Sequence, residues 1–224
     1  GATLEFGEPG SPVVVLVHDD HGRLPWLDQY ALELTRHVRA MRVATDRPLV
    51  VGVSGYGGSG KSTLARVLTA ALPGSVRLRG DDFLDPSRSH RRSPDWDGVD
   101  RLRLVEEVLD PLRSGRGGAF RRYDWGRRAL GGPERLPETD LLVVDLIGLL
   151  HPETRPWIDL AVWCDVDLET ASARGMARDA RLGRDHDALW RDVWIPNERD
   201  FDAGFAPRAS ADVLLPDAPG STNT

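Results

Sequence analysis

The first candidates for chemistry in this sequence are a lysine, a serine and the glycines before them. Residues 55–62 read GYGGSGKS, which fits the pattern G-x-x-x-x-G-K-[ST] of a phosphate-binding loop. In such a loop backbone N–H groups turn inward on an anion, the lysine supplies a cation and the hydroxyl a magnesium ligand. The residues expected to hold nucleotide phosphates are Gly55, Gly57, Gly58, Ser59, Gly60, Lys61, Ser62 and Thr63.

The lysine of this loop is unusual in its own chain. Lys61 is the single lysine among 29 Lys and Arg residues. A chain that otherwise uses arginine indicates that this position cannot take a planar guanidinium, as expected where a compact ammonium inserts between two phosphates. The composition therefore favours a phosphate-binding loop over a chance glycine-rich turn.

Acidic residues follow two apolar segments that read as strands. Asp81 and Asp82 come just after residues 76–79, and Asp145 ends the apolar run 141–145. The carboxyl ends of parallel strands form the ligand-binding edge of an open sheet. We therefore predict that Asp145 and Ser62 hold magnesium, and that Asp81 is a general base and a further magnesium contact. For Asp81 and Asp82 an ordinary Asp-Asp turn is the alternative.

Arginines recur along a predicted helix over residues 168–184. Arg174, Arg178 and Arg181 are four and three residues apart, which places them on roughly one helix face. A solvated arginine stripe is the ordinary explanation of such spacing. In a nucleotide-dependent phosphotransferase the same stripe suits a closing lid that neutralises the transferring group.

The elements that must position these residues are those of an α/β fold. Alternating strand and helix patterns predict three α/β/α layers with a mainly parallel sheet. Together with the phosphate-binding loop and the arginine-bearing lid, this predicts a P-loop NTPase fold. Strands are predicted at 13–17, 49–53, 76–79, 141–145, 160–164 and 211–215, and helices at 27–41, from the loop to about 72, 100–112 and 168–184. Residues 85–100 read as a loop. Residues 120–125 either clamp a planar or anionic substrate or form a hairpin that packs its own aromatics.

We divide the chain into three parts. Residues 1–47 are predicted to form a strand and a helix packed on the core, residues 48–216 the main domain with a lid at about 174–190, and residues 217–224 a loose tail. Within the first part, His18, Asp19, Asp20 and His21 are better explained as a polar loop than as a metal site.

Composition narrows the class of protein further. The chain has 224 residues and a formal net charge of −6, which argues against broad nucleic-acid binding. A single cysteine, Cys164, rules out an intrachain disulfide and fits a reducing compartment. No signal or membrane-spanning pattern is present, so we expect a cytoplasmic protein that binds neither membrane nor nucleic acid. The protein could form a homo-oligomer, and the sequence does not indicate its oligomeric state.

From about residue 49 to residue 216 the chain resembles the uridine kinase, phosphoribulokinase and bacterial pantothenate kinase branch of P-loop kinases. Four blocks carry the resemblance in the family's order: GYGGSGKST at 55–63, GDDF at 80–83, YDW at 123–125 in place of Tyr-Asp-Phe, and the arginine-bearing RDARLGRD at 178–185. The segment Ala-Asp-Val-Leu-Leu at 211–215 is similar to the family's last strand.

The resemblance implies a role for several residues. Asp81 would take the proton of the acceptor hydroxyl, assisted at the phosphates by Lys61. ATP and Mg²⁺ would be the cofactors, and a small molecule with a hydroxyl the acceptor. Arg174, Arg178 and Arg184 would contact phosphates from the lid, with Arg178 and Arg184 counted as catalytic. The residues expected beside the acceptor are Asp82, Phe83, Asp97 and Tyr123.

Two departures from the family pattern affect this expectation. Asp145-Leu146 stands where the family has Glu-Gly, so the carboxylate is one methylene shorter. Gly126-Arg127-Arg128 stands where many uridine kinases have a histidine, which weakens the case for pyrimidine recognition.

A second resemblance is confined to the N-terminal segment. His18 to Trp26 resembles the start of a dienelactone-hydrolase-type α/β hydrolase, but no G-x-S-x-G elbow follows it, so we do not expect hydrolase activity.

From the motifs and the resemblance to P-loop kinases we expect a kinase that transfers the γ-phosphoryl group of ATP to a nucleoside. The alternatives are a sugar or pantothenate-like acceptor, or a nucleotide-binding regulator without transfer.

Overall fold

A computed structural model describes residues 13–14 and 26–217, and its main feature is a six-stranded parallel sheet. The strand order is β1-β8-β7-β2-β6-β3, and every neighbouring pair in this sheet is parallel. The strands are β1 (Val13–Val14), β2 (Leu49–Ser54), β3 (Val76–Arg79), β6 (Leu141–Asp145), β7 (Leu160–Asp165) and β8 (Val213–Pro216). The central strands β2 and β6 are buried along their whole length, as parallel strands covered on both faces must be.

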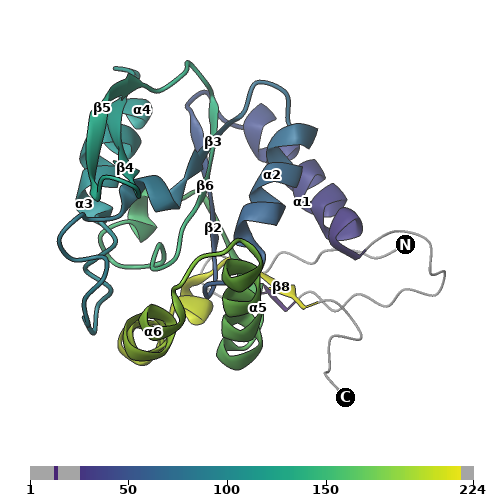
Figure 1. Ribbon diagram of the computed structural model, residues 1–224. Helices are drawn as coiled ribbons and strands as arrows, with labels where there is room; N and C mark the ends of the chain where they lie inside the picture. The colour runs from purple at the N-terminus through teal and green to yellow at the C-terminus, as the bar shows by residue number, and fades with distance from the viewer. Residues whose placement is uncertain (1–12, 15–25, 218–224) are drawn as a thin grey trace.

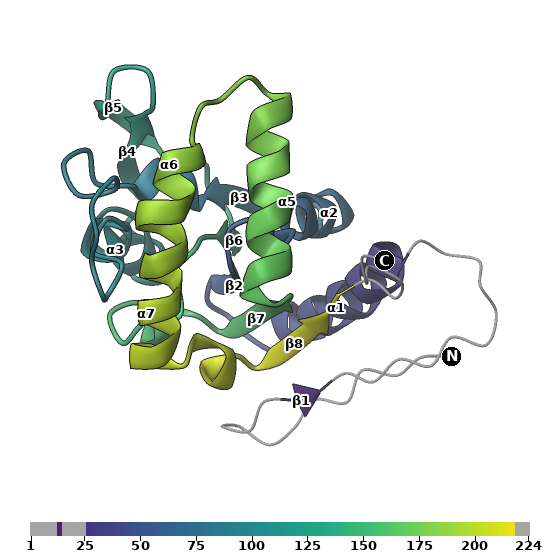
Figure 2. The ribbon, with the colours of Figure 1, turned by 60° about the horizontal axis from the view of Figure 1, so that its bottom comes forward.

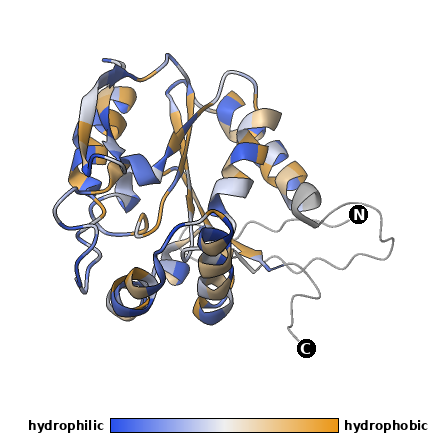
Figure 3. Cartoon of the chain, viewed as in Figure 1, coloured by the Kyte–Doolittle hydropathy of each residue, from blue (hydrophilic) through white to orange (hydrophobic). Residues whose placement is uncertain are grey.

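Helices cover both faces of this sheet (Figure 1). On one face α1 (Trp26–Val43) and α2 (Lys61–Ala71) bury residues such as Leu34 and Leu64 against β2 and β6. The other face carries a second core that includes Phe83, Trp96 and Phe201. Hydrophobic colour is concentrated on the central strands and on the inner sides of the helices (Figure 3). The prediction of an α/β fold with three layers and a mainly parallel sheet is confirmed.

The second face is built from a helix and a hairpin. α3 (Arg101–Leu104) and α4 (Asp110–Arg113) form one helical rod through a π-helical turn, Val105–Leu109. Beside it β4 (Ala119–Asp124) and β5 (Ala129–Arg135) form an antiparallel hairpin. The aromatic and cationic segment at 120–125 therefore lies in a hairpin strand, where Phe120 and Tyr123 are buried.

Two further helical segments, which follow the carboxyl end of β7, run side by side (Figure 2). α5 (Leu168–Arg181) begins at Asp167, whose carboxylate accepts the Thr170 N–H at 2.8 Å. Through the turn at residues 182–186 it leads into a second rod, formed by α6 (Asp187–Leu189), a π-helical turn (Trp190–Trp194) and α7 (Ile195–Phe205). We call α5, the turn and this second rod the helical arm.

The N-terminal segment contributes to the same sheet and core. β1 pairs with β8, and Tyr30, Leu34 and Val38 of α1 are buried. The division into an extension, a main domain and a tail stays a prediction. The interpretations that concern residues 15–25, including His18 to His21, and the tail 218–224 fall outside the described residues. In the described part no helix is long and apolar enough to cross a membrane.

Candidate active site

The phosphate-binding loop joins β2 to α2 in a conformation that requires glycine. Gly55, Gly58 and Gly60 have φ of +145°, +88° and +96°, a region that L residues with a Cβ rarely adopt. At Gly58 a Cβ would also lie 2.0 Å from the Ala171 carbonyl oxygen of α5. The first turn of α2 carries no acidic residue, so its positive end is free for an anion.

Lys61 lies inside this loop rather than in solvent. Its side chain is buried, and Nζ donates a hydrogen bond to the Tyr56 carbonyl at 2.7 Å. Burial lowers the pKa of Lys61, while the negative charges of Glu198, Asp81 and Asp145 act in the opposite direction. The ammonium is therefore held close to the loop, with carboxylates around it.

Ser62 and Asp145, the predicted magnesium ligands, are in direct contact. Ser62 Oγ donates to Asp145 Oδ2 at 2.7 Å. This contact arises because β6 pairs with β2 so that Asp145 lies opposite Val53, just before the loop. A hydroxyl beside a carboxylate at a phosphate-binding loop suits Mg²⁺, which takes few protein ligands and completes its shell with phosphates and water. No cluster of three or more His, Cys, Asp or Glu in metal-binding geometry occurs among residues 13–14 and 26–217.

Asp145 has a second partner that the sequence did not indicate. Arg77 of β3 donates from Nε to Oδ1 at 2.9 Å and from Nη2 to Oδ2 at 2.8 Å. β3 pairs with β6 in parallel, which brings Arg77 to the carboxylate. The predicted magnesium ligand is thus already neutralised by a cation.

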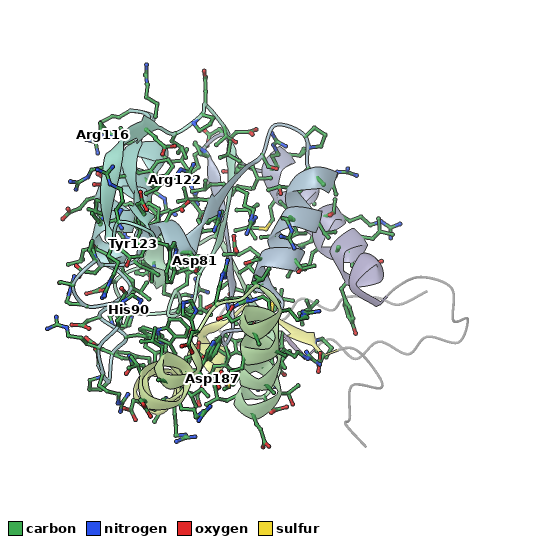
Figure 4. The ribbon with its side chains drawn as sticks, viewed as in Figure 1. Asp81, His90, Arg116, Arg122, Tyr123 and Asp187 are labelled. Atoms are coloured by element: carbon green, nitrogen blue, oxygen red, sulfur yellow. The ribbon has the colours of Figure 1, made fainter. Side chains whose placement is uncertain are left out.

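Asp81 and Asp82 have opposite environments although they are neighbours. Asp81 is exposed, is the second residue of the 3₁₀ turn Gly80–Phe83 after β3, and lines the cavity over the phosphate loop (Figure 4). Asp82 is buried and forms an ion pair with Arg122 of β4. Of the two acids, Asp81 is placed where a base for an acceptor is needed.

The other residues predicted beside the acceptor lie outside the cavity lining. Phe83 is fully buried and stacks on Phe120 with ring centroids 5.8 Å apart. Asp97 lies 3.8 Å from Arg88 in an ion pair, and Tyr123 packs edge-on against Trp125. None of Asp82, Phe83, Asp97 and Tyr123 belongs to the cavity lining within the described residues. Their contact with an acceptor stays a prediction.

The three predicted lid arginines line the cavity but are ion-paired within the protein. Arg174 forms a bidentate pair with Asp217 at 2.8 and 3.0 Å. Arg178 and Arg184 approach Asp179 at 3.1 and 3.6 Å. Contact with phosphates would require these guanidinium groups to leave their present partners, and it stays a prediction.

Asp179 connects the two sides of the helical arm. Its buried carboxylate accepts hydrogen bonds from Trp190 Nε1 at 3.0 Å and lies 3.1 Å from His186 Nδ1. Burial by itself would raise the pKa of Asp179, but the hydrogen bonds from Trp190 and His186 and the charge of Arg178 lower it below the ordinary value. Asp179 is therefore an ionised anchor of the arm.

Glu198 of α7 was also missed by the sequence analysis. Its Oε1 accepts the Gly57 N–H of the phosphate loop at 2.8 Å, and its Oε2 is buried without a hydrogen-bond partner among the described residues. Burial raises the pKa of Glu198 to about 7, against the opposing charge of Lys61. The helical arm is thereby attached to the loop that would hold the phosphates.

Aromatic side chains form the far wall of the cavity, which has a volume of about 810 Å³. Trp194 lies edge-on to His186 at 5.3 Å and to Trp190 at 5.2 Å between ring centroids. Trp96 has φ +54°, and its Nε1–H, like Ser89 Oγ, is buried without a partner within the described part of the chain. Trp125, which is 40% exposed, and Trp194 offer flat apolar surface to the cavity, whereas Trp96 and Ser89 are each only 2% exposed.

Comparison with known proteins places the chain in a family. Residues 50–222 match the model of the phosphoribulokinase / uridine kinase family. The chain belongs to this family, and the P-loop kinase relationship inferred from the four sequence blocks is confirmed.

Individual relatives are distant and differ in length. The chain is 30% identical over 118 residues to uridine-cytidine kinase C of Dictyostelium discoideum, which covers 51% of this chain and 26% of that protein. It is 26% identical to a uridine kinase of Staphylococcus haemolyticus, covering 75% of this chain and 87% of the relative. It is also 26% identical to the phosphoribulokinase of Synechocystis sp., covering 78% of this chain and 55% of that protein.

A solved structure supports the fold. The structure of a possible uridine kinase from Bacillus stearothermophilus superposes with a TM-score of 0.65 at 18% identity, covering 84% of this chain and 98% of the other. At this identity the similarity concerns the fold.

Proposed function

We propose that this protein is an ATP-dependent kinase that transfers the γ-phosphoryl group to a hydroxyl of a small molecule, with a nucleoside as the first candidate. The observation that carries the proposal is one continuous cavity, lined by Gly58, Lys61 and Ser62 of the phosphate loop, by Asp81 and by Trp96. A phosphate-binding loop, an exposed carboxylate and an acceptor-sized hollow therefore open onto the same space.

Each group supplies positioning or charge, which is what phosphoryl transfer mainly requires. Lys61 and the loop amides would hold the β- and γ-phosphates of ATP. Ser62 and Asp145 would hold Mg²⁺, which would supply positive charge to neutralise the phosphates. Asp81 would orient the acceptor hydroxyl and accept its proton, and the arginines of the arm would stabilise the transferring group.

The aromatic wall supports an acceptor with a planar ring. Trp96, Trp125 and Trp194 line the cavity together with the uncharged Ser89 and Leu84. A planar aromatic base can stack on this wall with its whole ring face, which a pantothenate-like chain cannot do and a sugar does only through its C–H groups.

A substrate panel tests the proposal. Purified protein with ATP and Mg²⁺ is incubated with nucleosides, sugars and pantothenate, and ADP release is measured with a phosphorylated product identified by mass spectrometry. We expect turnover with at least one nucleoside, and loss of that turnover in Lys61→Ala. Nucleotide binding without ADP release on any acceptor would contradict a kinase.

A non-catalytic nucleotide-binding regulator is the second candidate. It is favoured by one observation: both oxygens of Asp145 are already bound by Arg77. The same panel separates the two candidates, because a regulator would bind ATP and release no ADP.

A further inference from the structure

Arg77 binds the carboxylate of Asp145, which is one of the two predicted magnesium ligands. Two parallel hydrogen bonds of 2.9 and 2.8 Å join the guanidinium to the carboxylate. The side chain of Asp145 is only 4% exposed and that of Arg77 19%. A charge-assisted bidentate pair with little access to water is one of the stronger side-chain contacts in proteins.

This pair leaves the carboxylate little capacity to bind a metal directly. A carboxylate offers about four lone-pair positions. Arg77 uses two of them and the Ser62 hydroxyl a third, at 2.7 Å on Oδ2. Mg²⁺ requires near-octahedral geometry, with oxygen ligands at about 2.0–2.1 Å. A direct bond from Asp145 would therefore compete with the contact to Arg77.

The positive charge of Arg77 also weakens the binding of Mg²⁺ at this site. A guanidinium stays protonated at all physiological pH values and so always repels a dication. Because the pair is largely shielded from water, solvent screens this repulsion only in part. Ser62 is affected differently: its hydroxyl donates a hydrogen bond to Asp145, which leaves the lone pairs of its oxygen available to the metal.

We propose that Arg77 sets the magnesium affinity of this site, weakening it by neutralising Asp145 and directing that carboxylate to act through Ser62 and through metal-bound water. The inference rests on the proposed function only in assuming that nucleotide and Mg²⁺ bind at the loop. Arg77 is a positioning residue, since it acts on the metal through Asp145.

The test measures metal binding directly. Isothermal titration gives the dissociation constant of ADP in EDTA, and then that of Mg²⁺ for the protein–ADP complex, for the wild type, Arg77→Gln and Arg79→Gln. Arg79 is the matched control because it lies on the same strand and lines, together with Arg77, the hollow beside Ser62 and Asp145, yet it is exposed and is not an ion-pair partner of Asp145 among the described residues.

We expect Arg77→Gln to bind Mg²⁺ roughly tenfold more tightly, with metal-free ADP affinity changed much less, and Arg79→Gln to change Mg²⁺ affinity less than Arg77→Gln does. Arg77→Lys, which keeps the charge, should stay near the wild type and serves if the glutamine variant does not fold. Unchanged or weaker Mg²⁺ binding by Arg77→Gln, beside normal ADP binding, would overturn the inference alone. A wild type that binds no ADP would overturn the proposed function and the inference with it.

Discussion

At the scale of single residues, two adjacent acids show how environment assigns chemistry. A general base must be reachable by the acceptor, and Asp81 is exposed at the cavity while Asp82 is buried against Arg122. Their position after the same strand does not tell them apart, and the prediction of Asp81 as the base came from the resemblance to the kinase family. Their difference depends on Arg122, which is 40 residues away from Asp82 in the sequence.

Asp81→Asn should therefore abolish most of the transfer without affecting nucleotide binding. We expect the rate to fall by about a hundredfold or more, the usual scale for loss of a general base, with the ADP dissociation constant within about twofold of the wild type. Steady-state kinetics and titration measure the two quantities. Asp110→Asn, at an exposed acid on α4, is the control, and an unchanged rate in Asp81→Asn would remove Asp81 from the mechanism.

Glu198 gives a pH-dependent prediction. Its pKa is about 7 in the folded protein against an ordinary value of 4.5, so the folded state binds the extra proton between these values. The stability that the protonated form contributes is fully present below pH 4.5 and is lost as the pH rises through 7.

Glu198→Gln should remove this loss, because the amide is neutral at every pH and can still accept the Gly57 N–H. Urea unfolding at pH 5 to 8 measures the free energy of unfolding of both proteins. Relative to the wild type, this free energy should increase for the variant as the pH rises, by on the order of 2–3 kcal/mol between pH 5 and pH 8. A constant difference between the two proteins across this range would show that Glu198 does not titrate there.

At the scale of elements, the helical arm depends on one buried anion. Asp179 of α5 is contacted by His186 in the turn and by Trp190 of the second rod, as well as by the arginines Arg178 and Arg184. The two sides of the arm are therefore joined by charge-assisted hydrogen bonds at a single carboxylate.

Asp179→Ala should destabilise the protein by roughly 3 kcal/mol, since breaking a buried pair leaves its partners unsatisfied. Asp187→Ala is the matched control: Asp187 lies on the same arm, but it and its partner Arg191 are 59% and 64% exposed (Figure 4), and such surface pairs contribute about 1 kcal/mol or less. Chemical denaturation measures both. Equal effects of the two substitutions would mean that Asp179 does not anchor the arm.

The elements themselves were predictable to different degrees. Strands β2, β6 and β7 are continuous apolar runs, which single-sequence patterns reveal well. The rod at residues 187–205 was not predicted, since Pro196 and many charges interrupt it. Trp190, Trp194, Phe201 and Phe205 do recur at helical spacing and were the available signal.

The residues of the candidate site were also predictable to different degrees. The phosphate loop and Asp145 could be located because their signature lies within a few consecutive residues. Glu198 and Arg77 could not, because their partners Gly57 and Asp145 lie 141 and 68 residues away. The alternation of apolar and charged residues along β3 predicts that the Arg77 side chain points away from the apolar core. Which carboxylate it reaches becomes clear only from the pairing of β3 with β6.

At the scale of the whole molecule, nucleotide binding should be visible as added stability. A ligand that binds only the folded state stabilises it by about 2.7 kcal/mol at a concentration of a hundred times its dissociation constant. For a chain of this size that corresponds to a rise in Tm of roughly 5–10 °C.

Differential scanning fluorimetry with Mg²⁺ and ADP measures this rise. We expect Lys61→Ala to remove most of it, because the variant loses the cation among the phosphates. AMP, which lacks the β-phosphate, is the ligand control and should raise Tm less. An equal rise for the wild type and Lys61→Ala would place the nucleotide elsewhere.

The position of β3 at the edge of the sheet affects the tendency of this protein to aggregate at high concentration. Among the described strands β3 ends the sheet, opposite to β1. An uncovered terminal strand invites a strand of another molecule to join it, and charged side chains are a common deterrent. β3 has four residues, two of which are Arg77 and Arg79. Of these two arginines Arg79 is the exposed one and suits this role, whereas Arg77 is held on Asp145, so substitutions at Arg79 should be checked for aggregation.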